Sequence, residues 1–281
     1  MAAAPRKFRT VVRRQARKGR RASAKSPFRC WRCKGTLEQH NGSLQCENGD
    51  AEHSPRRGVL NLLPPGPDPG GDVFDTWYGR LYDAAVNRRE LAVPGGFLMW
   101  GADVARVYEA MDEAIECKPG EFVVDVPAGG GVTFARGAAE TGGQLVGLDL
   151  SAAMLERAAK RRRELRLDTK TVLLARGDAT RLPFFDSSVD RICCFNSLHC
   201  IPHHAAVLKE FRRVLKPAGE LVGTTLVVDA PPPWRLNVEL ARVGGFFVPP
   251  VSAVLARQAK AAGFERWHTK RSGALLYFRG E

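Results

Sequence analysis

The chain has 281 residues, enough for one large domain or two unequal ones. It has no run of about 18 apolar residues and no apolar N-terminal segment, which excludes a membrane-spanning helix and a secretory signal. The net charge of +13 is uneven: residues 1–37 hold thirteen Lys and Arg and no acid, whereas the rest of the chain holds 30 basic and 30 acidic side chains.

Residues 1–27 form a basic tail, which is expected to be a disordered, solvated extension. Two alternatives stay open. The tail could bind RNA or another polyanion, or its Arg-rich, acid-free composition could be that of an organelle transit peptide.

Residues 28–63 form a small Cys-rich module. Cys30 and Cys33 make a Cys-x2-Cys turn, and twelve residues separate Cys33 from Cys46. Structural zinc prefers four ligands, and a module this small needs such a site for stability. For the fourth ligand, His53 is preferred over Asp50 because neutral imidazole is the better zinc ligand. The remaining cysteines are scattered, which is typical of a protein of the reducing cytosol and not of a disulfide framework.

A Pro/Gly linker at 64–72 leads into a segment, 73–281, in which helical and strand patterns alternate. This alternation predicts an α/β fold, a Rossmann-like, seven-stranded, mostly parallel sheet with helices on both faces, preceded by the zinc-ribbon-like module. The expected helices are 73–91, 101–116, 133–140, 152–165, 205–215 and 251–262. The expected strands are 121–126, 144–149, 171–176, 189–196, 219–227, 264–270 and 274–279.

A Gly-rich loop from Asp125 to Gly131 follows the first strand of this segment. Its glycines let the backbone approach a ligand closely. The loop alone does not identify the ligand, because dinucleotide sites use similar turns.

Two acidic residues at the ends of the next two strands indicate which kind of ligand the loop binds. Asp149 lies 24 residues after Asp125, where a carboxylate can accept both hydroxyl hydrogens of a ribose. Asp178 follows the third strand and can accept from an adenine amino group.

These motifs, in this order over about residues 120–228, resemble the class I S-adenosylmethionine (SAM)-dependent methyltransferases of the methyltransferase-11 type. The resemblance implies that the loop, including Asp125, Ala128, Gly129 and Gly131, contacts the methionine part of SAM. It further implies cofactor contacts from Asp149, Leu150, Met154, Asp178, Ala179 and Asn196. The sequence departs from the family at Pro127, where glycine is usual.

Methyl transfer from a sulfonium needs mainly alignment, with a general base for some acceptors. His199 is the best placed candidate for that base, because it follows the fourth strand and lies close to Asn196. The alternative is a buried histidine without a proton-transfer role.

Three functions remain open. The segment Phe74–Asp83 resembles the lead helix of small-molecule methyltransferases, and the apolar stretch Gly244–Pro250 could line a pocket; both favour a quinone-like or lipidic acceptor in the cytoplasm. Cys30–Pro64 instead resembles the zinc module of bacterial rRNA (guanine-N1) methyltransferases, which implies RNA recognition by the module and the basic tail, although Asp50 stands where that family has histidine. The third alternative is a SAM-fold binding protein without transferase activity.

Overall fold

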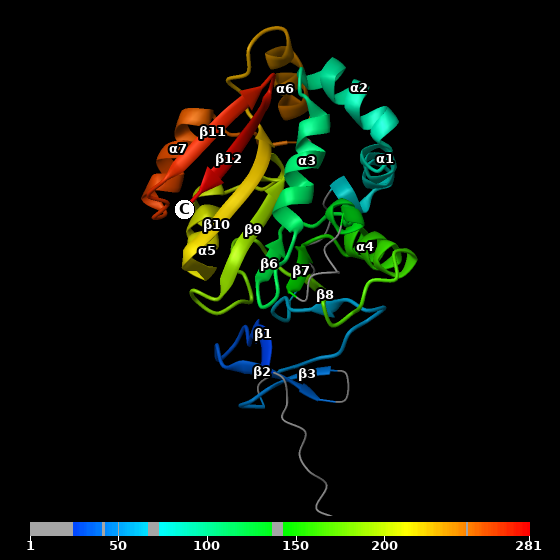
Figure 1. The fold of residues 1–281 in the computed structure, drawn as a ribbon, viewed down its shortest axis with the longest axis vertical. Coiled ribbons are helices and arrows are strands. Elements are labelled where there is room, and N and C mark those ends of the chain that lie inside the picture. The colour runs from blue at the N-terminus through cyan, green and yellow to red at the C-terminus, as the bar shows by residue number, and fades with distance from the viewer. Residues whose placement is uncertain (1–24, 41–42, 50, 67–72, 137–142, 246) are drawn as a thin grey trace, which may run out of the picture.

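The computed structural model describes residues 25–281 except 41–42, 50, 67–72, 137–142 and 246. Residues 1–24 of the basic tail, most of the linker and Asp50 therefore lie outside the described residues. Figure 1 shows a large twisted sheet with helices packed on it and a smaller sheet at one end. Within the described residues, no helix is both long and apolar enough to cross a membrane.

The large sheet has eight strands. In spatial order they are β11 (Trp267–Ser272), β12 (Leu275–Gly280), β10 (Leu215–Leu226), β9 (Val189–Phe195), β6 (Phe122–Asp125), β7 (Gln144–Asp149), β8 (Val172–Arg176) and β5 (Leu60–Asn61). The pairs from β10 to β5 are parallel, and β12 runs antiparallel to both β10 and β11. The predicted Rossmann-like sheet of seven strands is confirmed, with β5 added at its edge.

Helices cover both faces of this sheet. One hydrophobic cluster joins its strands to α3 (Val104–Ile115) and α4 (Ala152–Glu164). A second cluster joins them to α5 (His204–Val214) and α7 (Ser252–Ala261). Each parallel strand is thus covered on both sides, which explains why the strands read as nearly continuous apolar runs. The N-terminus of α4 is capped by Ser151, whose side chain accepts a hydrogen bond from the Met154 N–H.

Three further helices lie at one end of the molecule: α1 (Trp77–Val86), α2 (Arg89–Trp100) and α6 (Trp234–Val243) (Figure 1). The prediction of one helix over 73–91 is wrong. A short 3-10 turn, η1 (Val73–Asp75), precedes α1, and Arg88, in an extended conformation, separates α1 from α2. Of the helix expected at 133–140, the structure describes a 3-10 helix, η2 (Val132–Arg136).

The Cys-rich module is a four-stranded antiparallel sheet of β1 (Lys25–Arg29), β2 (Thr36–His40), β3 (Ser43–Cys46) and β4 (Glu52–His53). It packs against the large sheet, since the rings of Phe28 and Phe184 stack 5.6 Å apart and the Arg29 N–H donates to the Pro183 carbonyl at 2.9 Å. Its buried side chains belong to the same hydrophobic cluster as α5 and α7. Through β5 the module also contributes a strand to the large sheet.

Candidate functional site

A cavity of about 420 Å³ opens where the parallel strands β6, β7 and β9 end. Ligands of open α/β sheets bind at this edge. The cavity is lined by every predicted cofactor residue except Gly131, and by His199: Asp125, Ala128, Gly129, Asp149, Leu150, Met154, Asp178, Ala179 and Asn196. The structure therefore brings residues from four separate motifs to one site.

The Gly-rich loop forms the floor of the cavity. Gly129 has a φ of +53°, and a Cβ added there would point into open space, so the glycine leaves room for a ligand close to the backbone. Gly131 has a φ of +74° and lies behind the loop, where an added Cβ would meet the Phe134 ring at 2.5 Å. Pro127 is accommodated through a cis peptide bond with Val126.

Asp149 ties the loop to the end of β7. One carboxylate oxygen accepts a hydrogen bond from the Gly129 N–H at 2.7 Å, and the other accepts from the Ser151 N–H at 2.9 Å. The side chain is 6% exposed. Each carboxylate oxygen can accept more than one hydrogen bond, so the geometry fits a carboxylate that also binds two hydroxyl groups in the cavity.

The opposite side of the cavity is held by short turns after β8 and β9. Asp178 accepts a hydrogen bond from the Thr180 N–H at 2.8 Å. Asn196, with a φ of +52°, accepts from the Thr224 hydroxyl at 3.0 Å, and its N–H donates to the Thr224 carbonyl at 2.9 Å. These contacts fix the polar groups of both residues before a ligand binds.

Asp125 is the deeply buried acid of the site, 2% exposed. The Thr133 hydroxyl donates to its carboxylate at 2.5 Å. Burial raises the pKa of Asp125 to about 7; the Thr133 hydrogen bond opposes that shift and the charge of Asp149 adds to it. Asp125 therefore changes its charge near neutral pH.

This raised pKa predicts a pH-dependent stability. Between the ordinary pKa of 3.8 and about 7, the folded protein binds a proton at Asp125 that the unfolded chain has released. The contribution of Asp125 to the free energy of unfolding therefore falls as pH rises through this window, by up to about 4 kcal/mol. Urea unfolding of the free protein as a function of pH measures the effect.

The Asp125→Asn variant is the control, because it removes the titration and keeps the shape. The difference in free energy of unfolding between this variant and the wild type separates the effect of Asp125 from that of His199. Burial lowers the pKa of His199, so its contribution to stability rises with pH instead of falling. Identical pH dependence in the two proteins would show that Asp125 does not titrate in this range.

His199 is buried, 4% exposed, and packs edge-to-face against Phe247. The Leu226 N–H donates to its Nδ1 at 3.2 Å, which leaves the ring proton on Nε2. Burial, with a smaller effect of His204, lowers the pKa of His199 to about 3. At neutral pH the ring is thus neutral, and because its Nδ1 lone pair already accepts from the Leu226 N–H, it is suited to donate a hydrogen bond from Nε2.

The wall opposite the strands is made of residues that were not predicted as site residues. It comes from α1, α2 and α3 and includes Tyr78, Tyr82, Leu91, Met99, Tyr108 and Met111. Asp75 joins this wall to the cofactor loops, because its carboxylate accepts from the Ser151 hydroxyl at 2.5 Å and from the Ala153 N–H at 3.3 Å. The spacing of Tyr78 and Tyr82, one turn apart on a helix, is the sequence signal that could have indicated a shared face.

The three cysteines of the module are brought together. The sulfur atoms of Cys30, Cys33 and Cys46 lie within 4.8 Å of one another. The Gly35 N–H and the Asn48 side-chain amide both donate to the Cys33 sulfur at 3.4 Å, as suits a thiolate. The donor set and its hydrogen bonds fit a zinc ion.

His53 is not brought to this cluster. Its Nδ1 is hydrogen-bonded to the Asn61 carbonyl at 2.7 Å, and its Nε2 is buried without a hydrogen-bond partner. Because β4 pairs with β3, the ring is directed toward the β5 segment and not toward the thiols. The other candidate for the fourth ligand, Asp50, lies outside the described residues.

Comparison with known proteins agrees with this geometry. The model of the methyltransferase-domain family matches residues 124–223. A demethylmenaquinone methyltransferase of Beutenbergia cavernae is 35% identical over 122 residues, which cover 43% of this chain and 46% of that protein. The 27-O-demethylrifamycin SV methyltransferase of Amycolatopsis mediterranei is 29% identical over 163 residues, covering 57% of this chain and 60% of the relative.

The chain thus spans about half the length of the curated relatives it matches. Among solved structures, a chain from the complex of the Haloferax volcanii Trm112 methyltransferase activator with the putative methyltransferase superposes with a TM-score of 0.54 at 19% identity. That match covers 75% of this chain and 98% of the other. The strand order and the cavity at the strand ends are those of a Rossmann-like fold, and residues 124–223 within it match the methyltransferase-domain family.

Proposed function

We propose that the chain transfers the methyl group of SAM to a small, largely apolar acceptor of quinone-like or lipidic character. The observation that carries this proposal is the second half of the cavity. Beyond Asp149 and Asn196 it continues between the strands and the helical wall, lined by apolar side chains that include Leu91, Val107, Met111, Phe195, Phe247 and Leu275. A ligand bound there would contact few charged groups.

The residues that would hold SAM follow from the contacts above. Asp149 would accept from the ribose hydroxyls, Asp178 and Ala179 would border the adenine, and the loop at Ala128 and Gly129 would face the methionine part. The bound sulfonium supplies an already activated methyl group. The protein then needs mainly to orient the acceptor, which the wall of α1 to α3 is suited to do.

His199 and Asn196 are the polar groups we assign to the acceptor side. The neutral His199 ring would donate a hydrogen bond from Nε2, and the Asn196 amide, held by Thr224, offers further donors. Two such groups suit an acceptor oxygen on an otherwise apolar ring. The names of the two curated relatives, a demethylmenaquinone and a rifamycin methyltransferase, support an acceptor of this kind.

The test supplies methyl-labelled SAM with two acceptors in parallel, a lipid extract containing unmethylated quinones and purified ribosomal RNA. We expect label in the lipid fraction and none in RNA above a no-enzyme control. Label in RNA alone would overturn the proposal.

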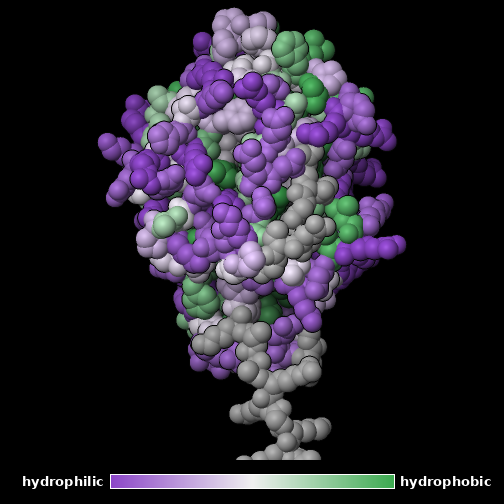
Figure 2. All heavy atoms as spheres, in the orientation of Figure 1, coloured by the Kyte–Doolittle hydropathy of each residue, from purple (hydrophilic) through white to green (hydrophobic). Residues whose placement is uncertain are grey.

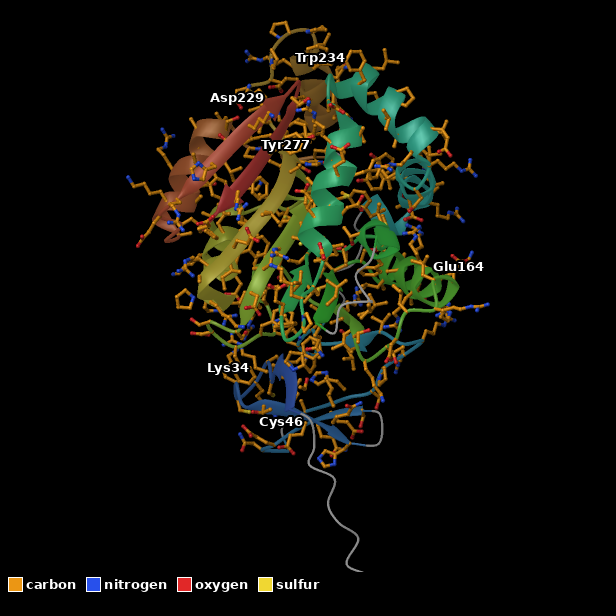
Figure 3. The ribbon with its side chains drawn as sticks, in the orientation of Figure 1. Lys34, Cys46, Glu164, Asp229, Trp234 and Tyr277 are labelled. Carbon is orange, nitrogen blue, oxygen red and sulfur yellow. The ribbon has the colours of Figure 1, made fainter. Side chains whose placement is uncertain are left out.

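The alternative, rRNA (guanine-N1) methylation, is favoured by the basic tail and by the Cys-rich module. The position of the module relative to the cavity argues against this alternative. Among the described residues, none from 25–66 lines the cavity, and the module lies at the end of the molecule away from α2 and α6 (Figure 1). Figure 3 shows the same separation, with Lys34 and Cys46 far from Trp234. The remaining alternative, a SAM-fold protein without transferase activity, predicts label in neither fraction.

We further propose that Cys30, Cys33 and Cys46 hold a structural zinc ion, which fits the reducing cytoplasm as the location of the protein. The division into a tail (1–27), a module (28–63), a linker (64–72) and a SAM domain (73–281) remains part of this proposal. The module would serve the domain mainly as a support, because it supplies strand β5 and part of the core.

A further inference from the structure

The exposed apolar side chains of this protein are concentrated at one end. Among the described residues, eleven of the twelve large hydrophobic side chains that are exposed lie on α1, α2, α6 or the segment 248–251; the other is Leu165, directly after α4. In Figure 2 hydrophobic spheres are visible among paler and hydrophilic ones at the end of the molecule where α2 and α6 lie. Single exposed hydrophobic residues are ordinary, but a gathered set marks an interaction surface.

Helix α2 departs most from a normal surface helix. After Glu90 it contains no charged residue as far as Trp100, yet none of its residues is fully buried. Phe97 and Leu98 are 64% and 78% exposed. A helix that is apolar around most of its circumference is normally covered by other protein or by lipid.

Helix α6 adds a parallel apolar stripe. Leu236, Leu240 and Val243 follow one another at helical spacing and are 64%, 62% and 77% exposed, whereas Val238 faces the protein interior. The two helices are joined directly, because the Asn237 amide donates to the Met99 carbonyl at 2.7 Å. We call the outward residues of these two helices the apolar patch: Leu91, Phe97, Leu98, Leu236, Leu240 and Val243.

The charges beside the apolar patch have one predominant sign. The exposed charged side chains of α1, α2, α6 and the residue before α2 are five arginines (Arg80, Arg88, Arg89, Arg235 and Arg242) and one glutamate, Glu90. Glu239, one third exposed, pairs with Arg242 at 2.7 Å, so arginine still predominates. Arginine can extend along an apolar surface and place its charge among headgroups. Apolar side chains with flanking arginines are the pattern of helices that lie in the interface of an anionic membrane.

The apolar patch is also continuous with the cavity. Leu91 belongs to the patch at 53% exposure, and the neighbouring Met99 is 51% exposed, yet both also line the cavity. The space beside the cofactor loop therefore reaches the surface through α2.

We propose that α2 and α6 dock the protein on the surface of an anionic lipid bilayer, with the apolar patch immersed among the acyl chains and the arginines at the headgroups. The cavity mouth would then face the lipid, so that an apolar acceptor could enter without crossing water. This entry route rests on the proposed function, whereas the docking itself does not require methyl transfer.

Vesicle flotation of the full chain tests the proposal, using phosphatidylglycerol mixed with phosphatidylcholine, without SAM or acceptor. The test variant is Leu98→Gln/Leu240→Gln, because neither residue lines the cavity. The matched control is Leu165→Gln, which makes the same change at the exposed hydrophobic residue outside this region. We expect the double variant to partition about 10- to 100-fold less than the wild type, and the control to partition like the wild type.

The basic tail would also attract anionic vesicles, so the comparison is repeated at high salt, where attraction between exposed charges is screened. The difference between the double variant and the control should persist there. Equal binding of all three proteins would assign vesicle binding to the tail and overturn the proposal. Absence of vesicle binding by the wild type would overturn the proposal too. If the wild type were then found to be a dimer and the double variant a monomer, the apolar patch would be covered by a second copy of the chain.

Two parallel measurements keep these outcomes interpretable. Thermal unfolding checks that each variant is folded. SAM affinity, measured by calorimetry, should be unchanged in all of them; retained SAM binding with failed docking would sink the membrane proposal and leave the proposed function standing.

Discussion

Replacing Asp149 with alanine is expected to weaken SAM binding by roughly 100-fold or more. The variant would lose the carboxylate that we assign to the two ribose hydroxyls. It would also lose the anchor for the Gly129 N–H, whose hydrogen bond of 2.7 Å holds the Gly-rich loop against the end of β7. Isothermal titration calorimetry with SAM measures the change directly.

Asp168→Ala is the matched control. Asp168 also accepts a backbone hydrogen bond, from the Lys170 N–H at 2.9 Å, but it lies outside the cavity. Its SAM affinity should equal that of the wild type. An intermediate loss is expected for Asp149→Asn, which keeps one acceptor and loses the charge. An affinity of Asp149→Ala for SAM within about threefold of the wild type would be a smaller loss than one hydrogen bond causes. The ribose would then have been assigned to the wrong residue.

The large sheet and the cofactor side of the cavity could be read from the sequence because each depends on local pattern. Strand β7 spans Gln144–Asp149, the predicted range, since its residues are buried on both faces and its end is marked by a polar residue. The parallel arrangement then brings Asp125, Asp149 and Asp178 to the same edge of the sheet. Their spacing along the chain was therefore sufficient to place them in one site.

The helical wall could not be read in the same way. Helix α2 contains Pro94 followed by two glycines, which are poor helix formers. Helix α6 begins directly after Pro231–Pro233, in a segment for which no helix was expected. In α2 no residue is fully buried, so the usual periodic signal is weak. For the part of the cavity that would select the acceptor, the sequence indicated only the segments Phe74–Asp83 and Gly244–Pro250, from which Phe74 and Phe247 line the cavity.

The long-range contacts of the module were hidden as well. Strand β5 has two residues, and only its pairing with β8 makes it a strand. The same segment decides the position of His53, because the Asn61 carbonyl accepts a hydrogen bond from its Nδ1. Ligand type and sequence distance favoured His53 as the fourth zinc ligand, but neither could show that β5 would turn the ring away.

Removing zinc with a strong chelator is expected to lower the free energy of unfolding by about 3–5 kcal/mol. The module is too small to hold its own core, and its buried residues, such as Phe28 and Leu37, are part of the cluster that includes α5 and α7. Losing the metal should therefore loosen β1 to β5 and one edge of the large sheet together. The melting temperature should fall by roughly 10 °C, given about 2–4 °C per kcal/mol for a domain of this size.

Cys33→Ala should reproduce the effect of the chelator and abolish stoichiometric zinc, measured by elemental analysis of the purified protein. Cys200→Ala, outside the module, should keep its zinc. Because the His53 ring is engaged with Asn61, His53→Ala should also retain the metal, whereas Asp50→Ala should weaken its binding. If His53→Ala loses zinc and Asp50→Ala keeps it, β4 and β5 must rearrange around the ion. If the native protein contains no zinc and its melting temperature does not change with chelator, zinc does not contribute to its stability.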